Sequence, residues 1–551
     1  MSPKRFKLIR FIFLICFAGL LVRLLSISSV MGKQYSVAAA SQQTRTRLLY
    51  TERGDILDRN GIRLTGREVE WKAILEPLTL LSQPGSLRTI SDILGIPVDE
   101  LSQTLSSNNL PHVVKITPNQ AEAIADSSLE GISVMDIRIR NGADTLAPHI
   151  LGYTDQTGQE GLAGLEKAYQ KTLDRGGGVY AGIIADAGDT VMNQFGYRIW
   201  NTMGKEKLDI RLTLDYHIQT IVEEVMGRMV DKGAAVVVDI LTGKVLALCS
   251  VPDYNPAYIN PYLNDENQPL FNRALGAYTP GSIFKIITAA AALENGISAD
   301  LTFDCPGYVD FGDTKMKCWS YNSGGHGTVN MAQAFAQSCN TYFIRLGLEL
   351  GRDKILDMAA KFGLGSKTGL YLEGIDEPSG SVPSTLGYAS AAEIGNLSIG
   401  QGGLLVSPVQ AANVSAVIAN GGILNRLTLV DCVLNQKGER VRNISRPSWE
   451  RVISKETAAS LQGMMLMTVQ SGTGELANIK GYGGSAGKTG SAETGWIKDN
   501  RAILHAWFSG YFPTHDPRYA LCVFIEDGKS GASSAAPVFA EISAKIVDAG
   551  Y

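Results

Sequence analysis

The chain has 551 residues, which at roughly 150 residues per domain is enough for three to four domains. Its 50 Lys and Arg nearly balance its 54 Asp and Glu, which argues against a nucleic-acid protein held by phosphate contacts. Hydrophobic residues at 45% exclude disorder for most of the chain, and seven Cys in this length are too few for a disulfide scaffold.

The N-terminus has the charge and hydropathy pattern of a membrane segment. Residues 1–10 carry four cationic side chains and no acidic one, and Phe11 to Val22 is an unbroken apolar run. Apolar residues resume after Arg23. Because a helix needs about 20 residues to cross the hydrocarbon layer, residues 8–30 suffice if Arg10 and Arg23 extend toward its two surfaces.

Two interpretations compete for this segment. A cleaved signal peptide needs a small-residue cleavage site, and the only candidate is at 38–40, far from the apolar run. We therefore expect an uncleaved single-pass anchor at 8–30, with a short tail at 1–7 in the cytoplasm. Everything after about residue 31 would then lie outside the cytoplasmic membrane, where disulfides are permitted.

Residues 31–205 predict a mixed α+β module in which short strands alternate with short helices. Trp71–Leu75 and Val113–Ile116 are apolar enough for strands, and Thr117–Ala125 has a helical pattern. Asn60-Gly61 is typical of a tight hairpin turn. A polar stretch just before Leu212 indicates a boundary, which we place at 205/206.

The region 206–551 predicts a larger α+β domain. It begins with an amphipathic helix and two apolar strands joined by a hairpin, and it ends with two strands and a helix. These elements are expected at Tyr216–Met229, Ala234–Asp239, Lys244–Cys249, 504–511, 519–526 and 537–549. Helical stretches dominate 284–420. Strands on both sides of a helical region favour an antiparallel sheet with a helical layer.

The most informative motif is the sequence YTPGSIFK, which ends at Lys285. Its Pro-Gly pair interrupts the chain, so Ser282 begins an apolar helix with its backbone N–H free to donate to a developing oxyanion. Lys285 lies on the same helix face and can take the serine proton if its pKa is lowered. S-x-x-K alone is weak evidence, because Ser485 and Lys488 match it too. An N-cap serine beside a solvated lysine is the alternative.

A second motif, Ser338-Cys339-Asn340, lies between two amphipathic segments and is expected on a loop between helices. A Ser hydroxyl there can shuttle a proton, and an Asn amide can hold a substrate amide. S-x-N also occurs at 106–108 and 320–322, where we interpret it as turn sequence.

A third motif, Lys488-Thr489-Gly490-Ser491, precedes the predicted strands at 504–526 and is expected on an edge strand that lines a cleft. Its ammonium and hydroxyl groups can bind a substrate carboxylate, and its glycine lets a substrate backbone lie close. The same K-T-G triplet at 367–369 falls in a Gly-rich turn, and we interpret it as a chance match.

Taken in order, S-x-x-K, S-x-N and K-T-G are the signature of penicillin-recognising serine acyltransferases. The chain resembles the class B penicillin-binding proteins of the division or sporulation type over almost everything after the anchor. Further segments similar to this family are Arg53–Gly61, His149–Tyr153, Asn272–Ala274, Gly400–Gly402 and Trp507–Tyr511. The resemblance implies a peptidoglycan D,D-transpeptidase without metal or cofactor. Such an enzyme cross-links stem peptides through an acyl-enzyme and is inhibited by β-lactams.

The resemblance also implies the domain organisation. The transpeptidase domain, an antiparallel sheet with a helical layer, would occupy 206–551, and an α+β pedestal or dimerisation-like domain would occupy 31–205. The segment 31–205 is too short to hold a glycosyltransferase domain as well. We therefore expect a partner that supplies glycan strands, a polytopic glycan polymerase of the same membrane.

Residue roles follow from the same resemblance. Ser282 would be the nucleophile, Lys285 its base in acylation, and Ser338 the relay of protons to the leaving D-Ala. Asn340 would hold the acyl-chain amide, and Lys488 would tune this network of hydroxyl and amine groups.

The remaining roles fall to the third motif. Thr489 and Ser491 would bind the terminal carboxylate of the donor peptide, and Gly490 lies between them. The backbone N–H groups of Ser282 and Ser491 would form the oxyanion hole. Two departures from the family pattern are Ser491, where Thr is common, and Cys339 as the middle residue of S-x-N.

Two rival functions are considered. A β-lactamase or carboxypeptidase of the same fold needs a base for the deacylating water, and Glu393 is the only carboxylate we can nominate. We interpret Glu393 as part of a turn-rich stretch, outside reach of the ester. A non-catalytic β-lactam sensor needs a cytoplasmic output domain, for which residues 1–10 are too short.

The cysteines allow more than one arrangement. Cys339 lies within the second motif and Cys318 on the loop leading to it, so the two could form a disulfide, and Cys305 is an alternative partner for Cys318. The other interpretation is isolated buried thiols. With six His and no CxxC or HExxH pattern, the sequence predicts no dedicated zinc site.

Overall fold

The computed structural model describes residues 3–27, 44–142, 144–184, 197–202, 204–312, 314–370, 375–384, 389–445, 447–498 and 501–551. Helix α1 spans Pro3–Leu25. Within the described ranges, no helix combines the length and the apolar character needed to cross a lipid bilayer. The end of the predicted anchor, 28–30, and the alternative cleavage site at 38–40 lie outside these ranges.

The chain divides into two compact units that interleave along the sequence. The first unit takes its described residues from 1–53, 68–139 and 174–207, and the second from 54–67, 140–173 and 208–551. This arrangement differs from the linear division at 205/206 expected from the sequence. The physical reason is that Ile56, Leu64, Leu151 and Leu165 belong to the main apolar core of the second unit.

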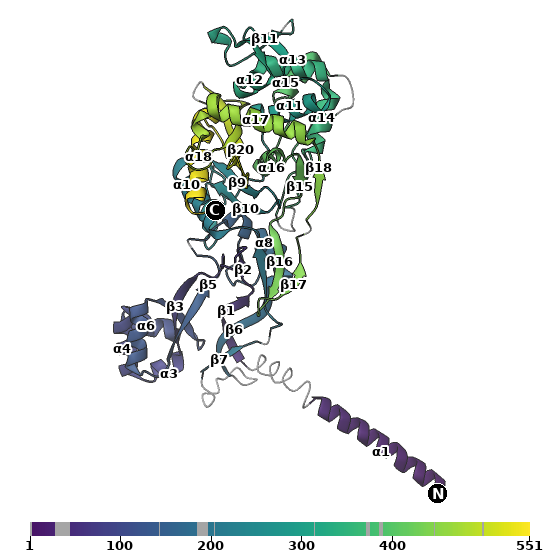
Figure 1. Ribbon diagram of the computed structural model, residues 1–551. Helices are drawn as coiled ribbons and strands as arrows, with labels where there is room; N and C mark the ends of the chain where they lie inside the picture. The colour runs from purple at the N-terminus through teal and green to yellow at the C-terminus, as the bar shows by residue number, and fades with distance from the viewer. Residues whose placement is uncertain are drawn as a thin grey trace. The chain divides into compact units, whose positions relative to one another are not determined.

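The first unit is an α+β module with two three-stranded antiparallel sheets (Figure 1). In sheet order the strands are β1 (Thr44–Arg53), β6 (Asp174–Ile184) and β7 (Tyr197–Asn201), then β4 (His112–Ile116), β3 (Glu68–Leu75) and β5 (Ile132–Ile139). The short helices are α3 (Pro77–Leu81), α4 (Pro84–Leu94), α5 (Val98–Ser106) and α6 (Pro118–Ser127). They cover one face of the second sheet, where Ala73 and Leu75 share a core with Leu87, Ile90 and Ile124. The strands and the helix predicted here are confirmed.

The second unit is built around a five-stranded antiparallel sheet in the order β10–β9–β21–β20–β19. These strands are β9 (Gly233–Asp239), β10 (Val245–Val251), β19 (Ala486–Lys498), β20 (Arg501–Phe512) and β21 (Tyr519–Ile525). Among the described strands β19 pairs only with β20, so the third motif lies on an edge strand, as predicted. Both faces of the sheet are buried, because Val236 and Val238 enter one core and Ala235 and Val237 another.

Helices cover both faces of this sheet (Figure 1). On one face lie α10 (Tyr216–Met229) and α18 (Ala536–Asp548), and on the other α11 (Lys285–Glu294), α16 (Pro408–Ala419) and α17 (Lys455–Ser471). The other α-helices are α7 (Pro148–Leu151), α8 (Gly164–Ala168), α9 (Gln170–Leu173), α12 (Met331–Ala336), α13 (Asn340–Leu350), α14 (Arg352–Lys361) and α15 (Ala391–Ser398). The predicted antiparallel sheet with a helical layer is confirmed, with helices on both faces.

Short strands form smaller sheets in this unit. One has four strands, in the order β17 (Arg440–Asn443), β16 (Val430–Asn435), β8 (Leu208–Leu212) and β2 (Ile56–Leu57). Three pairs are β11 (Thr302–Cys305) with β14 (Gly327–Asn330), β12 (Tyr308–Asp310) with β13 (Lys315–Lys317), and β15 (Ile423–Asn425) with β18 (Trp449–Arg451). The first two pairs shape the region that leads to the second motif.

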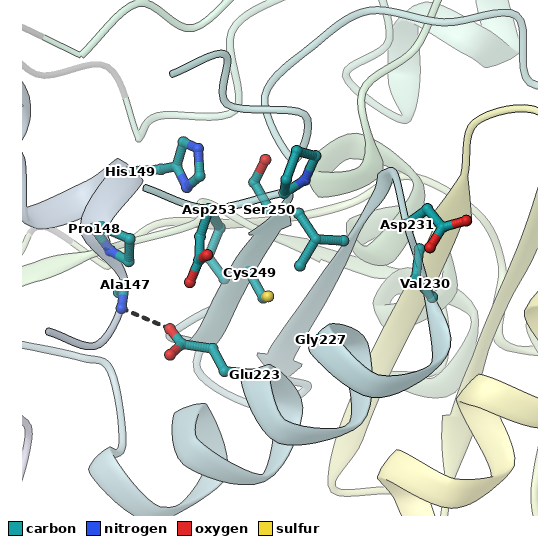
Figure 2. A pocket seen from close by; sticks show the side chains of 13 residues that line it. Ala147, Pro148, His149, Glu223, Gly227, Val230, Asp231, Cys249, Ser250 and Asp253 are labelled. Atoms are coloured by element: carbon teal, nitrogen blue, oxygen red, sulfur yellow. Dashed lines mark hydrogen bonds between the residues drawn. The ribbon is translucent and has the colours of Figure 1, made fainter. Parts of the chain in front are cut away.

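A cavity of about 280 Å³ in the second unit is lined by carboxylates of α10 and of the segment after β10 (Figure 2). Glu223 accepts hydrogen bonds from the backbone N–H of Ala147 (2.6 Å) and from Nε2 of Gln219 (2.7 Å). Ala147 has a φ of +49°, a strained value for a residue with a Cβ, so Glu223 stabilises this turn. Burial raises the pKa of the Glu223 carboxyl to about 7, and the charge of Asp253 adds to the shift.

Glu223→Gln should flatten the pH dependence of stability. The folded chain keeps a proton on Glu223 up to about pH 7, whereas the unfolded chain releases it near the usual pKa of 4.5. Stability of the wild type therefore falls as pH rises through this window, by on the order of 3 kcal/mol. Glutamine keeps the oxygen that accepts both hydrogen bonds but does not ionise. Melting temperatures at about pH 5 and about pH 8 should differ less for the variant; an equal difference would contradict this assignment.

Candidate active site

Ser282 lies in the turn that leads into α11. Residues Gly281–Phe284 form one 3₁₀ turn directly before α11, so the predicted position at a helix N-terminus is confirmed, with a tighter first turn. Gly281 has a φ of +55°, and a Cβ there would lie 2.9 Å from the carbonyl oxygen of Ser491. Glycine is therefore required for this turn to pack against β19.

Two distant segments hold the nucleophile turn in place. The N–H of Gly281 donates to the carbonyl oxygen of Gly400 (3.0 Å). Nε1 of Trp507 donates to the carbonyl oxygen of Thr279 (3.1 Å). Both contacts come from segments that resemble the family, and both fix backbone on the N-terminal side of Ser282.

Lys285 is fully buried at the start of α11. Its Nζ donates to the carbonyl oxygen of Ser338 (2.8 Å), to Oγ of Ser338 (3.3 Å) and to Oδ1 of Asn340 (2.8 Å). Burial lowers the pKa of Lys285 to about 8. A neutral amine that can accept a proton is therefore accessible near neutral pH.

Ser338 and Asn340 stand at the junction of α12 and α13, as the sequence predicted. Ser338 has a φ of +53°, which serine rarely adopts, and such strain is typical of functional positions. Asn340 is the first residue of α13. While its Oδ1 accepts from Lys285, its Nδ2 donates to the carbonyl oxygen of Lys317 (3.2 Å). The amide is thus fixed between two neighbours.

Lys488 lies fully buried on β19. Its Nζ donates to the carbonyl oxygen of Thr489 (3.0 Å) and to its Oγ1 (3.4 Å). Burial holds the pKa of Lys488 well below its usual value, and the charge of Lys285 lowers it further. Oγ1 of Thr489 also lies 2.6 Å from Oγ1 of Thr473. When Thr473 is the donor in this pair, the Thr489 hydroxyl is left to donate to a ligand.

One cleft of about 560 Å³ gathers the predicted residues. Those that line it are Ser282, Ser338, Asn340, Thr489 and Ser491. Lys285 and Lys488 lie behind them, without access to solvent. Gly490, predicted to let a substrate backbone lie close, also has a packing role. A Cβ there would lie 3.0 Å from the carbonyl oxygen of Pro280, so this glycine admits the nucleophile turn.

Seven residues of the cleft wall were given no role from the sequence. They are Lys317, Trp319, Thr473, Glu493, Leu504, Ser530 and Ala532. No motif marks them, because they come from separate segments that only the fold brings together. The one available signal is the Gly-Thr-Gly triplet at 472–474, which directly follows α17.

The competing motif matches have structural roles elsewhere. Ser485 is buried and donates its hydroxyl to the carbonyl oxygen of Ala477 (2.6 Å). In the alternative K-T-G triplet, the backbone N–H of Thr368 donates to the carboxylate of Glu377 (2.6 Å). Neither Ser485 nor Thr368 lines the cleft.

The sequence suggested that Glu393 lies in a turn. In the structure it is the third residue of α15. It is exposed, and its carboxylate accepts hydrogen bonds from the backbone N–H (2.7 Å) and hydroxyl (3.0 Å) of Ser390. This is a capping box, which holds the helix N-terminus. Glu393 is not part of the cleft wall.

All seven cysteines are free thiols, so neither disulfide considered from the sequence is formed. Instead Cys305, Cys318 and Cys339 lie with His326 in one group, whose ligand atoms are within 4.8 Å of one another. The prediction of no zinc site rested on linear spacing. The fold assembles a set of metal ligands that this spacing does not reveal.

A serine at a tight turn, a buried lysine of lowered pKa and an edge strand rich in hydroxyl groups together define a serine acyltransferase site. The penicillin-binding protein transpeptidase domain matches residues 233–544, and the penicillin-binding protein dimerisation domain matches residues 49–180. The chain belongs to the class B penicillin-binding proteins and is a peptidoglycan D,D-transpeptidase. The predicted family and activity are confirmed.

Individual relatives agree with this assignment. Stage V sporulation protein D of Bacillus subtilis is 28% identical, over 98% of this chain and 84% of its own length. The peptidoglycan D,D-transpeptidase MrdA of Acinetobacter baumannii is 29% identical, over 92% of this chain and 82% of its own length. In a solved peptidoglycan synthase complex, one chain aligns over 98% of both chains with a TM-score of 0.73 and 25% identity.

Proposed function

We propose that Ser282 is the nucleophile with which this enzyme cross-links stem peptides. The proposal is supported by the convergence of three distant motifs on one cleft. Oγ of Ser282 would attack the carbonyl carbon of the penultimate D-Ala, and its proton would pass to the neutral amine of Lys285. The backbone N–H groups of Ser282 and Ser491 would stabilise the oxyanion. Lys488, whose Nζ donates hydrogen bonds to both oxygens of Thr489, would tune the network of hydroxyl and amine groups and hold β19 in place.

The other groups orient the donor peptide and complete the proton transfers. Ser338, with its hydroxyl 3.3 Å from Nζ of Lys285, would pass a proton to the nitrogen of the leaving D-Ala. Asn340 would hold the acyl-chain amide. Thr489 and Ser491 would bind the terminal carboxylate. An amine from a second stem peptide would then attack the ester, and its proton would return by the same route.

A cross-linking assay with the purified full chain tests this function. A donor peptide ending in D-Ala-D-Ala is mixed with an acceptor that carries a free side-chain amine. We expect one D-Ala released for each cross-linked product and inhibition of both by a β-lactam. Release of D-Ala without any cross-linked product would indicate a carboxypeptidase instead.

The penicillin acyl-enzyme should be long-lived, because a serine ester hydrolyses quickly only when a base activates a held water. Glu393 caps α15 and does not line the cleft, so Glu393→Gln should leave the slow deacylation unchanged. Among the described residues, the carboxylate that does line the cleft is Glu493, and Glu493→Gln should likewise leave it unchanged. The measurement is release of labelled penicillin from the loaded wild type and both variants. Release within seconds that either substitution slows strongly would place the chain among the β-lactamases.

We also propose that residues 8–30 form a membrane anchor, with 1–7 in the cytoplasm and the catalytic region outside. The cationic residues before the apolar run support this orientation. The proposed pedestal at 31–205 and transpeptidase domain at 206–551 overlap the two matched family domains. A polytopic glycan polymerase is the proposed partner, because a related solved structure is described as coordinating polymerization and crosslinking. Protease protection of the catalytic region in inverted vesicles would check the topology.

A further inference from the structure

Four metal-ligating side chains converge beside the second motif. Cys305 ends β11 and His326 directly precedes β14, and the pairing of these two strands brings them together. The β12–β13 hairpin returns the chain to Cys318, whose N–H donates to the carbonyl oxygen of Gly307 (2.7 Å). Cys339 caps α13. One donor atom from each of the four residues lies within 4.8 Å of the others.

The spacing of the donor atoms fits a tetrahedral ion. Zinc–sulfur bonds of about 2.3 Å and zinc–nitrogen bonds of about 2.0 Å place neighbouring ligand atoms roughly 3.5–3.8 Å apart. Nδ1 of His326 lies 3.5 Å from Sγ of Cys305 and 3.6 Å from Sγ of Cys318. Oγ of Ser320 also lies 3.1 Å from Nδ1. With Nδ1 on a metal, this hydroxyl would donate to a thiolate instead.

The surroundings suit thiolates. The three thiols are 0–2% exposed. The backbone N–H of Asn340 donates to Sγ of Cys318 (3.3 Å), and that of Tyr342 donates to Sγ of Cys339 (3.4 Å). Such outer hydrogen bonds stabilise and orient metal-bound sulfur. A disulfide would use two of the three sulfurs and leave the third beside the imidazole, whereas a metal ion uses all four ligands.

We infer that Cys305, Cys318, His326 and Cys339 bind one Zn²⁺. Three Cys and one His make a closed four-ligand set of the kind that structural zinc sites use, with no position left for substrate. Binding replaces the three thiol protons with the metal, and the imidazole binds in its neutral form.

The ion would position the catalytic loop. Cys339 lies between Ser338 and Asn340, and the N–H of Asn340 donates to the Cys318 sulfur. Two of the four ligands therefore act directly on the loop that contacts Lys285, and they would hold Ser338 in its strained conformation. This positioning role rests on the function proposed above, whereas the metal site itself does not.

The first test is elemental analysis of the purified full chain, which should hold about one zinc ion. Cys305→Ala should lose most of the metal, whereas Cys432→Ala, at a buried thiol outside the cluster, should retain it. Because a ligand variant can fail to fold, the wild type is also loaded with Co²⁺. It should then show thiolate-to-cobalt charge transfer and the strong visible absorption of tetrahedral cobalt. A wild type that holds neither metal, or equal loss in both variants, would overturn the site.

The second test follows penicillin acylation as zinc is removed with a chelator and then restored. We expect the acylation rate to fall about 10²-fold and to recover on addition of zinc, since small displacements of catalytic groups have effects of this size. Circular dichroism should show the chain still folded. An unchanged acylation rate after zinc loss would overturn the positioning role. A zinc-loaded chain that never acylates would contradict the proposed catalytic residues and leave the metal site intact.

Discussion

Ser282→Ala should abolish covalent labelling of the chain by a fluorescent penicillin. Acylation needs an oxygen nucleophile. Among the serines of the cleft wall, Ser282 lies in the turn directly before α11, the helix that begins with Lys285. The fold should survive, because one hydroxyl at the start of a helix stabilises by at most about 1 kcal/mol. Gel fluorescence measures the labelling, and the melting temperature of the variant confirms that it folds.

Ser485→Ala is the matched control. Ser485 has the same spacing to Lys488 that Ser282 has to Lys285. Its side chain is buried, however, and its hydroxyl donates a hydrogen bond to the carbonyl oxygen of Ala477. The folded control should label like the wild type. Labelling that persists in Ser282→Ala and disappears in Ser485→Ala would show that the nucleophile has been assigned to the wrong motif.

Lys285→Gln should lower the rate of penicillin acylation by about 10²–10⁴-fold, the usual contribution of a positioned base. In the wild type the acylation rate should rise with pH through about 8. The amine accepts a proton only when neutral, and burial lowers the pKa of Lys285 to about 8. Rapid-mixing measurements of acylation from about pH 6 to about pH 10 would give both the rate and the profile.

Lys367→Gln is the control for this experiment, because Lys367 belongs to the alternative K-T-G triplet and does not line the cleft. It should change neither the rate nor the pH profile. A wild-type rate that is flat across pH 8, or a normal rate in Lys285→Gln, would mean that the serine proton goes to another group.

The parts of the fold that follow from local pattern could be predicted. The helix at Tyr216–Met229 has the bounds expected from its periodicity, and the hairpin of β9 and β10 follows from two apolar runs separated by a Gly-containing turn. The helix with Ser390 as its N-cap could also have been predicted, since S-x-x-E up to Glu393 is a capping-box pattern, which we interpreted as a turn. The three catalytic motifs were identifiable by their order in the chain.

What the sequence did not reveal depends on contacts between distant segments. Thr473 reaches the cleft only because α17 ends beside β19. The ligand set of Cys305 and His326 is assembled by a strand pair, and neither residue belongs to a compact ligand motif. The packing of Ile56 into the second unit likewise depends on β8, more than a hundred residues away, with which β2 forms a parallel pair.

The interleaving of the two units has a consequence for synthesis of the chain. Segments 54–67 and 140–173 leave the ribosome before 208–551, which supplies most of their core. The N–H of Ile210, for example, donates to the carbonyl oxygen of Asp55 (2.9 Å), so this early segment has no strand partner until β8 has emerged. The nascent chain must keep these apolar segments apart from each other and from neighbouring chains while the rest is made. Biogenesis of this enzyme therefore passes through a long interval in which the second unit is present but incomplete.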